Sequence, residues 1–263
     1  MLRFNDISKF ILNGKLHFSY NGGVMKQSDS LLKVRLWVYS LAFAHLVAIA
    51  AKLLTLDFTQ ASDPSVWAYE TFRWKLITCW FNIIGLAYFP LCIYCDYKDL
   101  QGESHKPLVK QLSNLRFLIY TSILFPTTTF ADVLFWRLWM KDRALLAPLT
   151  VDEIVPFWTQ HCMHTVTLVV TILDLILVPR KRPNSFKPGL IIMSIFLSSY
   201  FFVAVESYMK GEYLYPLIKL FTGFRMGILI LYVVVEHLFY YFAQFIVSEF
   251  IWGKDRKDKQ HSL

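Results

Sequence analysis

Two histidines three residues apart, His161 and His164, lie inside an apolar run of the sequence and are the side chains best suited to chemistry. On a helix, this spacing places both imidazoles on nearly the same face. With Asp132 or Glu206 as a third ligand, the pair could hold a metal ion. One imidazole could instead act as a general base for a hydroxyl nucleophile from another segment. A third interpretation is that both histidines only form hydrogen bonds that support packing.

Other ionisable side chains in the apolar runs are few. Each is costly at hydrocarbon depth, so each is a candidate for function. The full set is His45, Asp132, His161, His164, Asp174, Arg225, Glu236 and His237. Asp174 follows His164 by almost three helical turns, so we expect it to have a packing or relay role rather than to orient that imidazole.

The composition excludes an ordinary soluble enzyme. Of the 263 residues, 56% are hydrophobic and 17% are charged, and the mean hydropathy is +0.42. Soluble domains have about 45–50% apolar and about 25% charged residues. Apolar runs of about 20 residues recur, and each can cross the ~30 Å hydrocarbon core as a helix. We predict an all-α polytopic membrane protein with six transmembrane helices, near residues 35–56, 75–97, 115–140, 157–178, 189–208 and 218–247.

The basic residues of the connections predict the orientation of the chain. Sixteen lie in the N-terminal segment, the second and fourth connections and the C-terminal tail, whereas only four lie in the other three connections. Positive loops remain on the cytosolic side, so both termini should be cytosolic. The net charge of +8 therefore indicates membrane orientation rather than nucleic-acid binding. The predicted parts are a cytosolic N-terminal extension (1–34), the transmembrane domain (35–247) and a cytosolic basic tail (248–263).

The four cysteines all fall in or beside apolar runs and favour buried thiols. Cys92-x-x-Cys95 has no second pair that would complete a tetrahedral zinc site, and the pattern does not fit a disulfide framework. We therefore expect no cofactor and no metal, and the histidine-based metal site described above remains an alternative.

Helical depth places several polar groups in one layer. Counted inward from the face opposite the termini at ~1.5 Å per residue, Thr78 lies about 5 Å deep, His161 about 6 Å, and His164 and Arg225 about 11 Å. Asp132 lies about 12 Å below the same face. Four helices thus offer polar groups at the level where a site open to the outer leaflet would need them. At matching depth, Arg225 and Asp132 could neutralise each other or contact a substrate.

Residues 125–165 read FPTTTFADVLFWRLWMKDRALLAPLTVDEIVPFWTQHCMHT and form one ungapped pattern. Its landmarks are Phe125-Pro126, Phe135-Trp136, Asp142-Arg143, Pro148, Asp152, Pro156-x-Trp158 and His161-x-Met163-His164-Thr165. This pattern resembles the family of androgen-induced and androgen-dependent TFPI-regulating membrane proteins. Further landmarks are Trp74-Lys75-Leu76-Ile77-Thr78, Tyr215-Pro216 and Trp252-Gly253, so the resemblance covers roughly residues 35–253.

The resemblance implies a multi-pass membrane hydrolase that cleaves fatty acid esters of hydroxy fatty acids. Carried over by position, Thr78 is the nucleophile and His164 is the histidine that activates it. The sequence departs from the family pattern at Gln160, where the family has Asn, at Phe117, where it has Asp, and at Asp132, where it has apolar residues. These changes affect the expected substrate range more than the chemistry.

Around the implied dyad, five residues are candidates for substrate binding or support: His161, Gln160, Arg225, Asp132 and Trp158. The expected partners are a lipid substrate with long acyl chains and the bilayer of the endoplasmic reticulum or the plasma membrane. Two alternatives remain open. One is a non-enzymatic lipid transporter or receptor, and the other is a metal-dependent lipid hydrolase built on the histidines.

Overall fold

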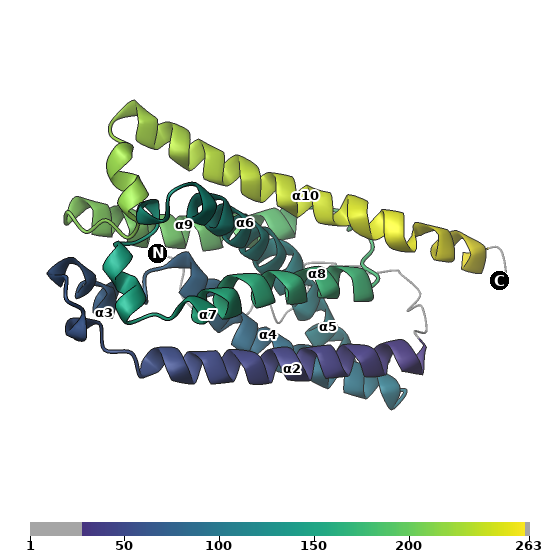
Figure 1. The fold of residues 1–263 in the computed structure, drawn as a ribbon. Helices are drawn as coiled ribbons and strands as arrows, with labels where there is room; N and C mark the ends of the chain where they lie inside the picture. The colour runs from purple at the N-terminus through teal and green to yellow at the C-terminus, as the bar shows by residue number, and fades with distance from the viewer. Residues whose placement is uncertain (1–27, 261–263) are drawn as a thin grey trace.

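Six long helical spans form the part of the protein that the structure describes, as the apolar runs predict. A computed structural model describes residues 28–260, with side chains for residues 28–253. The single-helix spans are α2 (Asp29–Leu54), α4 (Ile77–Leu100), α9 (Lys187–Met209) and α10 (Phe224–Gln260) (Figure 1). The third span joins α5 (Pro107–Ile119), a π-helical segment (Tyr120–Leu124) and α6 (Phe125–Lys141). The fourth joins α7 (Phe157–Gln160), a π-helical segment (His161–Val166) and α8 (Thr167–Leu177). No strand occurs among these described residues, which confirms the all-α prediction.

Both ends of the described chain lie at the same end of the bundle, as six spans require (Figure 1). The opposite end, which we call the distal end, carries the connections 55–76, 142–156 and 210–223. The short helix α3 (Tyr69–Phe72) belongs to the first of these connections. The cytosolic orientation of the termini remains a prediction.

Several helix ends extend beyond the spans that hydropathy predicts, whereas α10 begins at Phe224, six residues after the predicted start at 218. α2 begins at Asp29, because the Ser28 hydroxyl accepts the Leu31 N–H at 3.3 Å and caps the helix ahead of the predicted start at residue 35. α10 continues through Gln260, past residue 247. The predicted extension (1–34) and tail (248–263) therefore both contain helical residues, while residues 1–27 and 261–263 lie outside the described part. Hydropathy locates the apolar part of a helix, whereas capping sets its ends.

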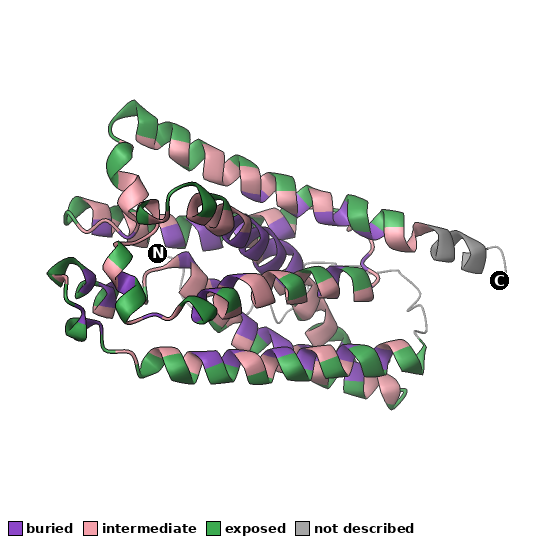
Figure 2. Cartoon of the chain, viewed as in Figure 1, coloured by how far each residue is buried: buried purple, intermediate pink, exposed green. Residues whose placement is uncertain are grey.

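The third span occupies the centre of the bundle. Figure 2 shows α6 as a continuous buried stretch among the other helices, and every residue from Phe125 to Asp132 is buried. α6 packs against both α8 and α10, while α2 packs along α4. Because residues 125–132 are surrounded by protein, the polar side chains of this stretch face neighbouring helices rather than lipid.

Two distal connections pack together into a cap over the end of the bundle. This distal cap comprises residues 56–76 and 142–156. Its apolar core contains Phe58, Ala61, Val66, Tyr69, Phe72, Val151 and Val155, with Leu214 packed beside them. The Ser62 N–H and hydroxyl donate to the Glu153 carboxylate at 3.0 and 2.7 Å, and these bonds hold the pKa of Glu153 below its ordinary value. The two connections are therefore joined by apolar packing and by polar contacts.

Candidate active site

His164 lies in the π-helical segment of the fourth span and is held by a buried carboxylate. Its Nδ1 is 2.8 Å from Oδ1 of Asp132, which lies on α6 and is 0% exposed. The other Asp132 oxygen accepts the Thr167 hydroxyl at 2.8 Å. A carboxylate accepts hydrogen bonds only, so Nδ1 carries the proton, and Nε2 of the neutral ring is left as a base.

The ring plane of His164 is fixed by an aromatic neighbour. Phe135, three residues after Asp132 on α6, stacks on the imidazole with ring centroids 3.6 Å apart and an interplanar angle of 8°. The imidazole is therefore held both at Nδ1 and over one face. π-Helical segments inside α-helices often occur at functional sites. Here the segment presents His164 to the central helix.

A cavity of about 340 Å³ lies beneath the distal cap and between α2, α4 and α6. Thr78, Gln160 and His164 share its wall, and most of the remaining wall is apolar. Its volume is within the range of ~300–1,000 Å³ typical of small-molecule sites. The two members of the implied dyad thus face one apolar space.

Thr78 is the second residue of the 24-residue helix α4, where backbone N–H groups have no partner within the helix. The Ile77 N–H donates to the Tyr215 hydroxyl at 3.3 Å, and the Cys79 N–H donates to the Leu76 carbonyl at 3.0 Å. The Thr78 N–H belongs to the same first turn, so it has no acceptor within the helix itself. Thr78 therefore offers a hydroxyl and an N–H at the positive end of the helix dipole.

The predicted supporting residues separate into two groups. Gln160 is buried and lies in the cavity wall, and Asp132 lies directly behind His164. His161 instead faces outward, with Nδ1 3.0 Å from the Thr165 hydroxyl, and Trp158 is 52% exposed and outside the wall. The two histidines do not converge, and across residues 28–253 no three His, Cys, Asp or Glu side chains are grouped to hold a metal ion.

The structure brings Arg225 neither to Asp132 nor into the cavity wall. Arg225 is exposed at the start of α10 and lies outside the cavity wall. Both Asp132 oxygens are instead bonded to His164 and Thr167. The predicted depth was counted from a span starting at residue 218, but α10 begins at Phe224, so Arg225 is the second residue of the helix and lies on the outer surface.

Two cations in the cavity wall were not identified as site residues from the sequence. Arg73 pairs with Glu70, and Arg143 pairs with Asp152 and lies 4.5 Å from the Trp139 ring centroid. Both arginines belong to distal connections, where the sequence indicates only that they help to set the orientation of the chain in the membrane. Asp142-Arg143 within the family pattern was the available signal for one of them.

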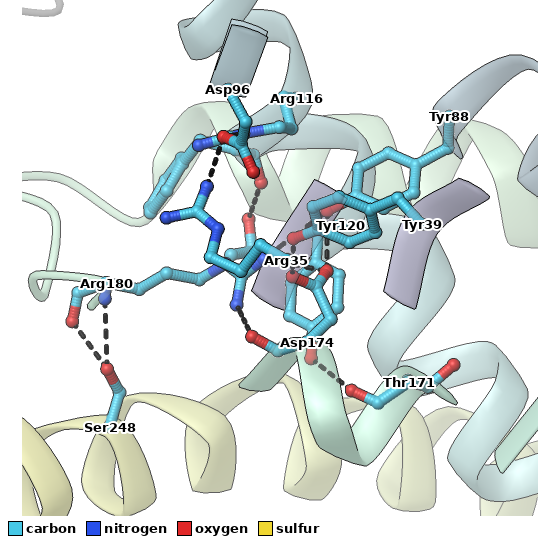
Figure 3. A network of polar contacts seen from close by, with 12 residues as sticks. Arg35, Tyr39, Tyr88, Asp96, Arg116, Tyr120, Thr171, Asp174, Arg180 and Ser248 are labelled. Atoms are coloured by element: carbon cyan, nitrogen blue, oxygen red, sulfur yellow. Dashed lines mark hydrogen bonds and ion pairs between the residues drawn. The ribbon is translucent and has the colours of Figure 1, made fainter. Parts of the chain in front are cut away.

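A second buried polar cluster occupies the opposite half of the bundle (Figure 3). Asp174 accepts hydrogen bonds from Tyr39 at 2.5 Å and Tyr88 at 2.6 Å, and it pairs with Arg180 at 2.9 Å. The Arg180 guanidinium also lies 3.5 Å from the Tyr120 ring centroid. This agrees with the predicted packing role of Asp174, because the cluster joins α2, α4 and α8.

Nearby in the same half, Asp96 pairs with two arginines, Arg35 of α2 and Arg116 of α5, the latter at 2.6 Å (Figure 3). Arg35 and Asp96 are almost completely buried. All three lie at or beside the predicted span edges, so their positions in the sequence did not mark them as intramembrane polar residues. They tie three helices together far from the cavity wall.

These features define a polytopic α-helical membrane protein whose apolar cavity contains a threonine and a histidine bonded to a buried aspartate. The chain belongs to the family described as FAR-17a/AIG1-like protein, which matches residues 39–248. This confirms the resemblance seen in the sequence.

Two human relatives illustrate the similarity. The androgen-dependent TFPI-regulating protein of Homo sapiens is 28% identical over 146 residues, which cover 55% of this chain and 62% of that protein. The androgen-induced gene 1 protein of Homo sapiens is 24% identical over 152 residues, which cover 56% and 63%. The chain thus spans less than two thirds of the length of these curated relatives. No solved structure is significantly similar to it.

Proposed function

We propose that the protein is an integral-membrane lipid hydrolase that cleaves fatty acid esters of hydroxy fatty acids, with Thr78 as nucleophile and His164 as general base. One observation carries this proposal: an imidazole fixed by a buried carboxylate lies in the wall of the same apolar cavity as a threonine at a helix N-terminus. Membership of the FAR-17a/AIG1-like family supports it.

In the first half of the reaction, Nε2 of His164 takes the hydroxyl proton of Thr78 as Oγ1 attacks the ester carbonyl carbon. Asp132 stabilises the imidazolium that forms and keeps the ring oriented. The Thr78 N–H donates to the developing oxyanion at the positive end of α4. When the tetrahedral intermediate collapses, the alcohol oxygen of the hydroxy fatty acid takes the proton from His164, and an acyl-threonine remains.

In the second half, His164 takes a proton from a water molecule as that water attacks the acyl-threonine carbonyl. The C–O bond to Thr78 then breaks, the threonine oxygen recovers a proton from His164, and the free fatty acid leaves. One ester and one water therefore give one fatty acid and one hydroxy fatty acid. Asp132 remains a carboxylate throughout.

The apolar wall suits long acyl chains, since burial of apolar surface contributes about 25 cal/mol per Å² before the cost of ordering the chains. The proposed partner is accordingly a lipid with long acyl chains in the membrane of the endoplasmic reticulum or the plasma membrane. Short water-soluble esters should be poorer substrates, because they forgo most of this burial.

The test is hydrolysis of the palmitoyl ester of hydroxystearic acid by purified protein in phosphatidylcholine vesicles. Thr78→Ala should abolish turnover while leaving the thermal unfolding temperature within the range of the wild type. A lipid transporter or receptor would bind the ester without hydrolysing it. A metal-dependent hydrolase would lose activity on chelation and would require His161 as much as His164. A fully active, well-folded Thr78→Ala protein would end the proposal.

A further inference from the structure

The apolar cavity opens sideways at one place. Three residues of its wall are exposed on the outer surface: Leu54 (60%), Trp74 (49%) and Ile83 (52%). All three lie at the end of α2 or around the start of α4, and the other residues of the wall are buried or half-buried. The opening therefore lies between these two helices.

The geometry of α2 and α4 explains the gap. The helices approach closely at Gly85, where a Cβ atom would lie 3.1 Å from Cδ1 of Leu46. Nearer the distal end, Ile49 and Ala50 of α2 and Ile83 of α4 line the cavity. The close approach at Gly85 thus marks the inner end of the opening.

The opening faces hydrocarbon rather than water. Ile83 lies six residues after Ile77, about 9 Å along the helix at ~1.5 Å per residue, and Leu54 is the last residue of α2. This depth range lies within one leaflet of a ~30 Å hydrocarbon core. Trp74 stands at the rim, where tryptophan is favoured at the membrane interface. The three exposed residues of the rim are all apolar.

We propose that the gap between residues 49–54 and 78–83 is a lateral portal, through which an acyl chain of the ester substrate enters from the distal leaflet. This inference rests on the proposed function and adds the route by which the substrate enters the cavity. The occupant is the acyl chain of a membrane-embedded lipid ester, because the exposed rim offers apolar side chains and faces acyl chains of the bilayer. The ester group reaches Thr78, which lies in the segment of α4 that borders the portal.

Two adjacent alanines of α2 provide a matched test. Ala50 lies in the cavity wall at the portal, whereas Ala51 is exposed and outside the wall. We compare Ala50→Trp with Ala51→Trp as full chains in phosphatidylcholine vesicles. The substrates are the palmitoyl ester of hydroxystearic acid and p-nitrophenyl acetate. In Ala50→Trp, the ratio of kcat/KM for the long ester to that for the short ester should fall at least tenfold, while in Ala51→Trp it should stay within twofold.

The portal would be contradicted if the two variants gave equal ratios of kcat/KM for the long and short esters. It would also be contradicted if well-folded Ala50→Trp lost kcat/KM equally on both esters. If Ala50→Trp does not fold, Ala50→Leu replaces it against Ala51→Leu, with a smaller fall in the same ratio expected.

A binding measurement separates the portal from the chemistry. In the Thr78→Ala background, the long ester retained by the purified protein is quantified by mass spectrometry, and adding Ala50→Trp should reduce it severalfold. Unchanged retention would contradict the portal. Full hydrolytic activity of Thr78→Ala alone would contradict the proposed function instead, while the retention comparison would still test the portal.

Discussion

Asp132→Asn changes the proposed catalytic unit with little change of shape. In the native protein the buried carboxylate accepts two hydrogen bonds of 2.8 Å, one involving Nδ1 of His164 and one from the Thr167 hydroxyl. The substitution keeps the volume of the side chain and removes its charge. It therefore separates the electrostatic role of Asp132 from its role in packing.

The expected loss of stability is small. The Asn oxygen can still accept from His164, while its NH₂ group faces the oxygen of Thr167. The Thr167 hydroxyl can then donate to the Met163 carbonyl, which is 2.6 Å away. Because no buried donor is left without an acceptor, we expect the free energy of unfolding to fall by only about 1 kcal/mol.

The expected loss of rate is much larger. A hydrogen bond to a charged partner contributes about 1.5–3 kcal/mol, which corresponds to roughly a 10–150-fold loss when the charge is removed. If the amide instead presents its NH₂ group to Nδ1, it stabilises the wrong tautomer, and the loss approaches the ~10⁴-fold found for this change in Ser-His-Asp triads. We therefore expect kcat to fall between about tenfold and about 10⁴-fold.

The assay measures kcat on the long-chain ester and thermal unfolding on the same samples. Asp99→Asn, the same chemical change at the opposite end of the bundle, is the control and should keep both values. If Asp132→Asn retains wild-type kcat with wild-type stability, the carboxylate does not serve His164, and the assignment of Asp132 fails.

Three further outcomes are expected. Thr78→Ala and His164→Ala should each abolish hydrolysis. Because both groups act in one step, the double variant should be about as inactive as either single one, and additive losses in kcat would argue against a joint role of Thr78 and His164. Asp174→Ala should destabilise the protein by about 3–5 kcal/mol in unfolding measurements, because it leaves a buried guanidinium unpaired, while kcat per folded molecule is retained. A glycosylation acceptor placed in the 57–72 loop should be modified and one placed at 181–186 should not, and the reverse pattern would invert the predicted topology.

The six spans could be predicted because hydropathy over about twenty residues is a local property of the sequence. The family pattern pointed to Thr78 and His164, and the structure places both in one cavity wall. Their chemical roles remain a proposal. Span edges were less accurate, because a capping residue such as Ser28 extends a helix beyond its apolar part.

The partner of His164 could not be predicted from depth alone. Depth fixes a position along a helix, but contact also depends on rotation about the helix axis and on where neighbouring helices pack. The π-helical segment His161–Val166 changes that rotation within the span. Arg225, at a similar predicted depth, lies on the outer surface because α10 begins only at Phe224, while Asp132 meets His164.

The cluster around Asp96 and Asp174 was only partly anticipated. Asp174 was recognised as an intramembrane polar residue, whereas Arg35, Asp96 and Arg180 lay at or beside span edges and were treated as part of the connections or boundaries. Long-range pairing buries them, such as the bond between Arg35 and Asp96, sixty-one residues apart in the sequence. A local pattern contains no information about such pairs.

Covalent labelling of Thr78 tests the central claim most directly. A long-chain alkyl fluorophosphonate is added to active protein in vesicles, and the modified residue is located by peptide mass spectrometry. The proposed mechanism predicts one adduct on Thr78 that appears as activity is lost, is absent from Thr78→Ala and forms much more slowly in His164→Ala. Complete inactivation with the adduct on another residue, or continued hydrolysis by Thr78→Ala, would contradict a threonine nucleophile.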